Sequence, residues 1–278
     1  MTGVQTCALP IFRFAVLNDL HYQSADCGRW LEKVTRQIKG HAGVEFCLLA
    51  GDLTEYGRRE DFAGLRAVFD SQKMPVYAVP GNHDYLAGNA PASPPALKLP
   101  VPARKSFSPK DERAQARPPL PPGKDNRRAY EEFFPRQLNY YFKHRGWQFV
   151  GLDSTQGLLY QKTSIQPATF QWVDEYLPRL SKKLPLVIFT HFPLGPGVHY
   201  RPANADDLLA RFKPYNLQAV VCGHWHGFTE HRLGAAALTT NRCCALKRDN
   251  HDNTKEKAYF LCTAARGEIT RDFIEVKG

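Results

Sequence analysis

The chain has 278 residues, of which 43% are hydrophobic, which is enough for one compact domain or at most two small ones. Its 23% of charged residues, 20 Gly and 21 Pro exclude a disordered or fibrous protein, and no apolar run reaches the roughly 20 residues of a membrane-spanning helix. The net charge of +10 favours nucleic-acid or phosphate ligands, but the position of the charges matters more than their sum.

Residues 1–11, MTGVQTCALPI, differ from the rest of the chain. They carry no charge, lack the basic flank of a secretory signal and match the translation of a common sequencing-library adapter. We therefore predict a non-native leader followed by a single folded domain over residues 12–278. Because a signal peptide would be lost together with the native start, the compartment stays open between the cytoplasm, which we favour, and export.

Short runs of β-forming residues are distributed along the chain, and most of them end in Gly, Asp, Asn or His. Helical spacing of apolar residues separates the first three runs, and strand, helix, strand at this distance is the βαβ unit with parallel strands. The tail over 236–276 alternates as strands around a polar loop, which favours antiparallel additions to an α/β sandwich. We expect strands at 14–17, 45–50, 76–79, 140–142, 148–152, 186–190 and 218–222, and helices around 30–38, 62–69, 169–180 and 206–212.

A basic, proline-rich segment interrupts this pattern. From Lys98 to Arg128 nine basic residues stand against three acidic ones, a net charge of +6, and ten of the 21 prolines lie between Pro91 and Pro122. Proline removes backbone donors, and the segment has too few apolar residues to pack. We predict that residues 89–126 form a solvated insertion on the domain, with a nucleic-acid-binding arm as the alternative.

The cysteines give no sign of a structural metal cage. Beyond the leader there are six of them, and none forms a CxxC pair, so we expect no zinc ribbon. Cys47, Cys222 and Cys262 lie in apolar runs and are expected to be buried thiols. For the adjacent Cys243 and Cys244 a reduced structural role is the default, with a redox-active or bridged pair as the alternative.

Polar side chains that can bind metals follow directly after five of the predicted strands. In open α/β sheets, ligands bind beyond the carboxyl ends of the strands, so the five segments are expected to converge on one site. They are Asp19-Leu20-His21, Gly51-Asp52, Gly81-Asn82-His83-Asp84, the single His191, and Gly223-His224-Trp225-His226. Carboxylate, imidazole and amide ligands suit Mn²⁺, Fe²⁺ or Zn²⁺, and seven candidate side chains favour two ions that share a bridging carboxylate.

This ordered set of segments resembles the calcineurin-like metallophosphoesterase superfamily. The resemblance implies a four-layer α-β-β-α sandwich with mixed sheets. It assigns His83 as the general acid and Asp84 as the carboxylate that orients it. The implied ligands are Asp19, His21, Asp52 and His226 for the first metal, and Asp52, Asn82, His191 and His224 for the second. The superfamily's purple acid phosphatases place Tyr three residues after the bridging Asp, where this chain has Glu55, which speaks against a tyrosinate-bound ferric ion.

The resemblance also implies a reaction, namely hydrolysis of a phosphoester by a metal-bridging hydroxide that attacks phosphorus in line, with His83 protonating the leaving oxygen. We expect a small phosphodiester substrate, such as a cyclic nucleotide or a phospholipid head group, rather than a monoester. The alternatives are a DNA- or RNA-processing nuclease of the same superfamily and a non-catalytic binding protein on the same fold. His199 and Arg201, on a Gly/Pro loop after His191, are candidates for substrate contact. The sequence does not indicate an oligomeric state.

Overall fold

The computed structural model describes residues 10–86 and 126–276. Nine residues of the predicted leader and nearly all of the predicted 89–126 insertion lie outside the described residues, so both stay predictions. The first strand, β1, covers Phe12–Leu17.

The first of two sheets contains three parallel strands at one side and an antiparallel pair at the other. Helices α1 (Ala25–Gly40) and α2 (Arg59–Ser71) connect the parallel strands, as the βαβ pattern predicts. Strand β10 pairs antiparallel with β1, and β11 pairs antiparallel with β10. In spatial order the strands are β11 (Glu268–Glu275), β10 (Ala258–Ala265), β1, β2 (Val44–Ala50) and β3 (Val76–Val79).

The second sheet has a parallel centre and antiparallel edges. In spatial order its strands are β4 (Tyr140–His144), β5 (Trp147–Leu152), β6 (Leu186–Thr190), β7 (Leu217–Cys222), β9 (Ala236–Thr240) and β8 (Thr229–Leu233). The expectation that the tail strands are antiparallel additions is correct for β10 and β11 but wrong for β9, which pairs parallel with β7. The reason is that β8, which the sequence did not indicate, returns as a hairpin and places β9 between itself and β7.

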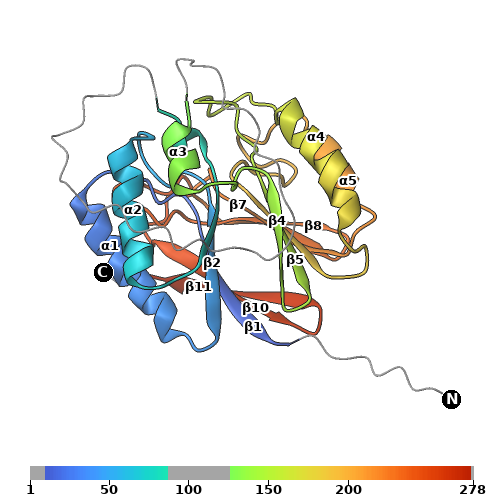
Figure 1. Ribbon diagram of the computed structural model, residues 1–278, viewed down its shortest axis with the longest axis horizontal. Helices are drawn as coiled ribbons and strands as arrows, with labels where there is room; N and C mark the ends of the chain where they lie inside the picture. The colour runs from blue at the N-terminus through green and yellow to red at the C-terminus, as the bar shows by residue number, and fades with distance from the viewer. Residues whose placement is uncertain (1–9, 87–125, 277–278) are drawn as a thin grey trace.

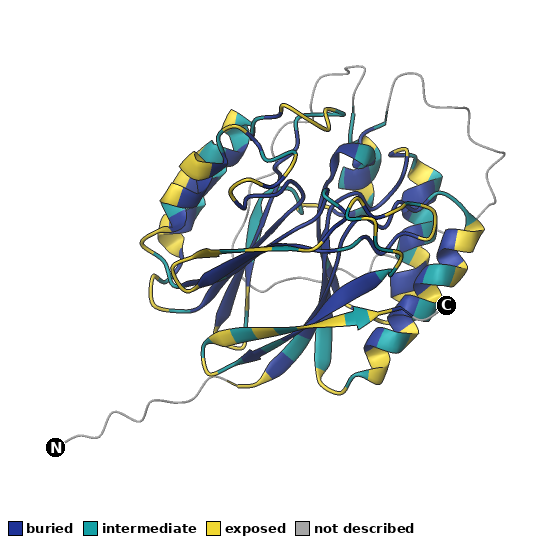
Figure 2. Ribbon diagram, turned by 180° about the vertical axis from the view of Figure 1, so that it is seen from behind, coloured by how far each residue is buried: buried dark blue, intermediate teal, exposed yellow. Residues whose placement is uncertain are grey.

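Alternating side chains on each strand create three apolar interfaces and hence four layers. On β1, Ala15 and Leu17 face α1 and α2, whereas Phe14 and Val16 face the other sheet. On β6, Val187 faces the first sheet and its neighbours face α4 (Pro167–Tyr176) and α5 (Ala205–Phe212). Figure 1 shows α1 and α2 on one outer side and α4 and α5 on the other, and Figure 2 shows the buried strands between them. The structure confirms the four-layer sandwich with two mixed sheets.

Shorter elements complete the domain. A 3₁₀ turn (Asn82–Asp84) follows β3, another (Leu177–Arg179) follows α4, and α3 (Arg128–Phe133), which the sequence did not indicate, packs Tyr130 against α2. In the part of the chain that the structure describes, no helix is long and apolar enough to cross a membrane. The six described cysteines are all buried and free of disulfide bonds, as expected for reduced structural thiols.

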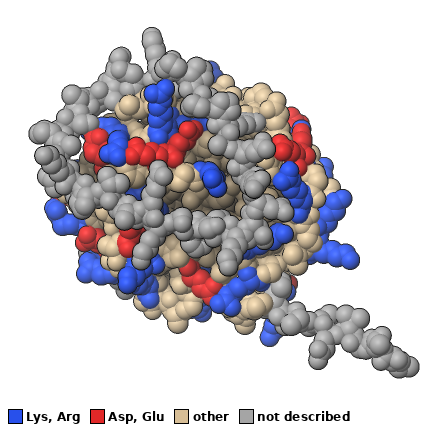
Figure 3. Space-filling model, viewed as in Figure 1, with Lys and Arg blue, Asp and Glu red and all other residues tan. Residues whose placement is uncertain are grey.

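One residue of the basic stretch is half-buried and paired with residues of the folded domain. Arg127 lies 2.5 Å from an Asp153 carboxylate oxygen and donates to the Tyr85 hydroxyl at 2.8 Å. Next to it, Leu86 and Asn126 form an isolated antiparallel bridge that joins the two described segments. On the face shown in Figure 3, the described Lys and Arg side chains are spread out, with acidic side chains among them. The charge of Arg127 is therefore compensated inside the protein and does not belong to a solvated arm.

Candidate metal centre

The seven side chains that the sequence selects as metal ligands lie together beyond the carboxyl ends of strands from both sheets. Asp52 and Asn82 follow β2 and β3, and His191 follows β6. Asp19 and His21 come after β1, and His224 and His226 come after β7. All seven are buried, with at most 7% of their surface exposed. The two sheets therefore contribute to a single polar site.

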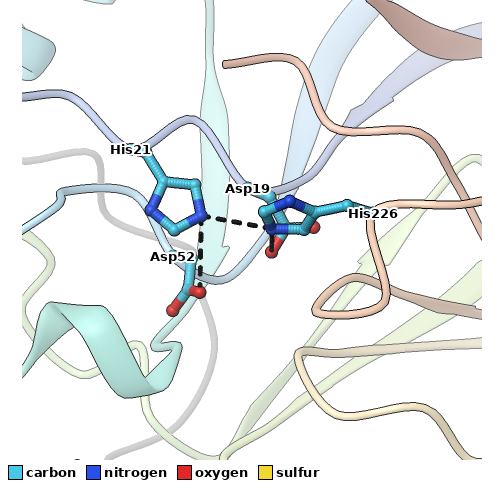
Figure 4. A group of neighbouring side chains, drawn as sticks. All are labelled: Asp19, His21, Asp52 and His226. Carbon is cyan, nitrogen blue, oxygen red and sulfur yellow. Dashed lines mark hydrogen bonds and ion pairs between the residues drawn. The ribbon is translucent and has the colours of Figure 1, made fainter. Parts of the chain in front are cut away.

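A first group consists of Asp19, His21, Asp52 and His226, whose potential ligand atoms all lie within 4.8 Å of one another. The Nε2 atoms of His21 and His226 are 3.2 Å apart, and the same His226 nitrogen is 3.2 Å from Asp19 Oδ1. Figure 4 shows the four side chains directed toward one another. This is the set implied for the first metal.

A second group adjoins the first and shares Asp52 with it. Its potential ligand atoms, from Asp52, His191 and His224, also lie within 4.8 Å of one another. His191 Nε2 is 3.1 Å from His224 Nδ1 and 3.1 Å from Asn82 Oδ1. The two carboxylate oxygens of Asp52 divide between the groups, with Oδ1 at 3.3 Å from His191 and Oδ2 at 3.6 Å from His21. Asp52 therefore has one carboxylate oxygen beside each group.

Each of the four imidazoles has its outward nitrogen next to an acceptor. His21 lies 2.9 Å from the Glu55 carboxylate, and His191 lies 3.1 Å from the Ala50 carbonyl. His224 lies 2.8 Å from the Tyr160 carbonyl, and His226 lies 3.1 Å from the Asp249 carbonyl. A hydrogen on the outward nitrogen leaves the inward nitrogen with a lone pair. Inward nitrogens only 3.1–3.2 Å apart would repel one another unless a cation or a proton lies between them. The donor set fits divalent metals.

Five of the seven candidate ligands share an uncommon backbone conformation. Asp19, His21, Asp52, His224 and His226 all have positive φ, between 45° and 67°. A residue other than glycine rarely adopts this conformation, which costs on the order of 1–3 kcal/mol at each position. Such strain persists only where the surroundings impose it, and it concentrates at functional sites.

Three glycines allow the backbone to approach the ligands. A Cβ at Gly81 would lie 2.1 Å from Asp52 Oδ1, and one at Gly51 would lie 2.5 Å from His191 Nδ1. A Cβ at Gly223 would lie 2.8 Å from an Asp19 carboxylate oxygen. Because no Cβ fits at these distances, the glycine before Asp52, Asn82 and His224 is a geometric requirement.

The electrostatics of the site favour ionised carboxylates. Burial by itself would raise the pKa of Asp52, but the neighbouring His191 and His83 outweigh burial and lower this pKa well below its usual value. Burial opposes a charged His191, yet Asp52 raises the pKa of His191 to about 9. For His224, burial and the nearby His191 lower the pKa to about 3. A buried pair of carboxylates surrounded by imidazoles is suited to a cation.

The structure places His83 beside the two groups but does not bring Asp84 to its ring. The His83 side chain is 30% exposed, and its Nδ1 donates to the Glu55 carbonyl at 2.9 Å. The Asp84 carboxylate instead accepts hydrogen bonds from the backbone amides of Leu53, Thr54 and Gly81. The expectation that Asp84 orients His83 is therefore corrected, because the carboxylate is occupied with holding the loops after β2 and β3.

Two residues of the site were not recognised from the sequence. Glu55 contacts His21 and forms an ion pair with the guanidinium of Arg248, whose Nε donates at 2.9 Å. Burial opposes its charge, but His21 and Arg248 lower the pKa of Glu55 to about 2. In the sequence, Glu55 was noted only because purple acid phosphatases have Tyr at the corresponding position. Arg248 lies 193 residues further along, in a loop with no recognisable pattern.

The two candidates for substrate contact have different surroundings. Arg201 donates from Nε to the Leu194 carbonyl at 2.9 Å and forms an ion pair with Asp206, so its guanidinium holds its own loop. The expectation of a substrate contact is therefore not supported for Arg201. The ring of His199, in contrast, stacks on Trp225 with 4.8 Å between centroids, next to His224 and His226.

Comparisons with known proteins agree with this geometry. The family model described as calcineurin-like phosphoesterase matches residues 12–228, a range that includes every candidate ligand. A dimetal phosphatase from Danio rerio superimposes with a TM-score of 0.57 at 14% identity, over 96% of this chain and 100% of that one. The protein TT1561 of Thermus thermophilus gives a TM-score of 0.55 at 12% identity, over 96% and 100% of the two chains.

A third solved structure is the anchor in the inner membrane complex of Plasmodium, with a TM-score of 0.54 at 15% identity, over 96% of this chain and 85% of that chain. At these identities the likeness establishes the shared fold. No curated protein sequence matches the chain. The family model, which covers most of the sequence, carries the assignment, and the chain belongs to the calcineurin-like phosphoesterase family.

Proposed function

We propose that this protein is a hydrolase for a small phosphodiester and that it works with two divalent cations. The observation that carries the proposal is the position of Asp52, whose two carboxylate oxygens face two adjoining groups of buried ligands. A diester has a second organic substituent that a monoester lacks. The rings of Tyr200 and Trp225, beside the second group, offer this substituent a surface.

The ligand assignment follows the two groups. Asp19, His21, Asp52 and His226 would hold the first cation, and Asp52, Asn82, His191 and His224 the second. Two bound cations, such as Mn²⁺, Fe²⁺ or Zn²⁺, would lower the pKa of water and neutralise charge on the phosphoryl oxygens. The protein supplies buried carboxylates, imidazoles fixed in one tautomer, and a rigid glycine-lined backbone that keeps them in place.

His83 is the group we propose as general acid. Because its Nδ1 donates to the Glu55 carbonyl, Nε2 is left for the substrate, and the half-buried ring lies 4.8 Å from the ring of His21. In its protonated form, this nitrogen can give a proton to the leaving oxygen of the ester. Proton transfer of this kind typically contributes about 10²- to 10⁴-fold to the rate.

The proposal is tested by hydrolysis of bis-p-nitrophenyl phosphate and p-nitrophenyl phosphate after chelation and after readdition of Mn²⁺, Fe²⁺ or Zn²⁺. We expect restored turnover with faster cleavage of the diester, and a loss of bound metal and of activity in Asp52→Asn. Asp272→Asn, an exposed acid on β11, serves as the matched control and should behave as the wild type. Turnover that survives both chelation and Asp52→Asn would contradict the metal mechanism, and faster cleavage of the monoester would contradict the substrate class.

A further inference from the structure

Five neighbouring rings lie in a cluster beside the candidate metal centre, which we call the ring platform: Tyr160, His199, Tyr200, Trp225 and His251. Tyr200 is at its centre, with ring centroids 6.3 Å from Tyr160, 6.1 Å from Trp225 and 6.4 Å from His251. His199 stacks on Trp225 at 4.8 Å and an interplanar angle of 27°. Four different loops contribute the five rings, so the proximity of the rings is a property of the fold.

The ring platform is in direct contact with the candidate ligands. The Tyr200 ring is 5.1 Å from the ring of His224, and His251 stacks on His226 at 4.7 Å and 14°. Trp225 lies between these two histidines in the sequence, and the backbone carbonyl of Tyr160 accepts the hydrogen bond from His224 Nε2. A molecule held by its phosphate at the metal centre would therefore reach the ring platform with its nearest substituent.

Two features argue against a role for these rings in packing alone. Tyr160 is 54% exposed, His199 and His251 are also exposed, and Tyr200 and Trp225 are half-buried, so ring surface faces solvent. Tyr200 also has a φ of 65°, in the left-handed region that is costly for a bulky residue. A Cβ at Gly227 would lie 2.8 Å from Trp225 Nε1, so the chain leaves space for the indole at this position.

The surrounding charge selects among the ligands that aromatic surfaces bind. Stacked rings accept flat aromatic groups or, by cation–π attraction, a quaternary ammonium. Two of the five rings are imidazoles, and Arg248 lies three residues before His251, held by an ion pair to Glu55 at the metal centre. The charge of Arg248 is balanced by Glu55, so the repulsion of an ammonium group would come from the bound metals. A neutral nucleobase would gain stacking without that repulsion.

We propose that the ring platform binds the nucleobase of a nucleoside phosphoester whose phosphate lies at the candidate metal centre. The position of the phosphate in this proposal rests on the proposed function. The substrate class is thereby narrowed from small phosphodiesters to nucleoside phosphodiesters, and Tyr200 becomes the main specificity residue.

The first test compares two diesters with the same leaving group, the p-nitrophenyl ester of thymidine 5′-phosphate and methyl p-nitrophenyl phosphate. Base stacking on an aromatic ring predicts a KM lower by about tenfold for the thymidine ester. Tyr200→Leu should abolish this difference in KM between the two esters, whereas Tyr200→Phe should keep it. Tyr176→Leu, which removes a ring stacked on Trp172 of α4, is the matched control. A KM ratio that Tyr200→Leu does not change overturns the proposal.

The second test does not depend on catalysis and separates the inference from the proposed function. Adenosine 5′-monophosphate, ribose 5-phosphate and phosphocholine are titrated calorimetrically into the Mn²⁺-loaded protein. The ring platform is supported if the nucleotide binds more tightly than ribose 5-phosphate and if both Tyr160→Ala and Tyr200→Leu reduce this difference in affinity. This conclusion holds even if no diester is hydrolysed, because the absence of hydrolysis would contradict only the hydrolase proposal. Equal binding of these two ligands, or tighter binding of phosphocholine, overturns the nucleobase assignment.

Discussion

Glu55 connects three parts of the candidate site through one residue. Its carboxylate lies 2.9 Å from His21 Nδ1 and pairs with Arg248, while its backbone carbonyl accepts the hydrogen bond of His83. An anion behind a ligand imidazole fixes the tautomer and increases the basicity of the inward nitrogen. The orientation of a proposed ligand and that of the proposed general acid therefore depend on the same short segment.

We predict that Glu55→Gln weakens metal binding, because the neutral amide cannot support His21 as strongly and loses the ion pair with Arg248. Loss of such an outer partner typically costs about 10- to 100-fold in metal affinity or activity. The measurement is a calorimetric Mn²⁺ titration together with kcat/KM for bis-p-nitrophenyl phosphate. Glu45→Gln removes a carboxylate that also pairs with a histidine and an arginine, His144 and Arg145, and should leave both quantities unchanged. Wild-type metal affinity in Glu55→Gln would contradict the prediction.

Residues of the site were predictable where the sequence places them next to a recognisable strand. His191 was found because it follows the uninterrupted apolar run of β6, whose observed bounds are the predicted ones. Arg248 was not found, since it reaches Glu55 through tertiary folding across 193 residues, and no local pattern encodes such a contact. The partner of His83 was predicted wrongly for the same reason: Asp84 was expected, but the ring is bonded to the Glu55 carbonyl. Hydrogen-bond partners in a tight 3₁₀ turn depend on the directions of the side chains, which no local sequence pattern encodes.

At the scale of elements, periodicity predicted the buried strands and helices but not those with exposed or irregular side chains. The run LVIFT of β6 is buried at every position, whereas β8 has the sequence TEHRL and no buried residue. Such a strand is held by its hairpin partner β9 and has no apolar alternation of its own. Helix α3, only six residues long, is likewise stabilised by the packing of Tyr130 and not by its length.

The turns after the strands lead to a prediction at this scale. Gly81→Ala should displace Asp52, because the new Cβ would lie 2.1 Å from its Oδ1 and 2.2 Å from its backbone nitrogen. Crowding of this kind costs about 1–3 kcal/mol of unfolding free energy and should also reduce the amount of bound metal. Urea unfolding and metal content per chain measure the two effects. Gly40→Ala, at the end of α1 with no atom within 4 Å of the new Cβ, is the control and should be neutral or slightly stabilising.

At the scale of the whole molecule, the packing between the two sheets determines the position of the site. The inner interface is rich in aromatic rings, and Phe149 of β5 lies 5.4 Å from Phe14, 5.3 Å from Phe46 and 4.8 Å from Phe142. All of these rings come from strands that the sequence predicted, yet their pairing across the interface could not be predicted, since it depends on the angle between the sheets. The candidate site lies at the common edge of both sheets and depends on that angle as well.

We predict that Phe149→Ala destabilises the protein by about 3–5 kcal/mol, through lost burial and a cavity between the sheets. Because the site takes ligands from both sheets, the folded fraction should also bind Mn²⁺ more weakly. Urea unfolding and metal titration at low denaturant measure the two effects. In the control Phe273→Ala, at a ring on β11 that is 39% exposed, the change should stay below about 1 kcal/mol. An unfolding free energy in Phe149→Ala within the range of this control would contradict the assigned interface.

Each ligand group takes residues from both sheets, and this arrangement has a consequence for the survival of the protein in a cell. In the first group His226 belongs to one sheet and Asp19 to the other, and the second group joins His191 and Asn82 in the same way. A cation held there would act as a cross-link between the halves, so its binding free energy would add to the free energy of folding. The metal supply would then set how long a newly made molecule resists proteolysis, in addition to how fast it turns over substrate.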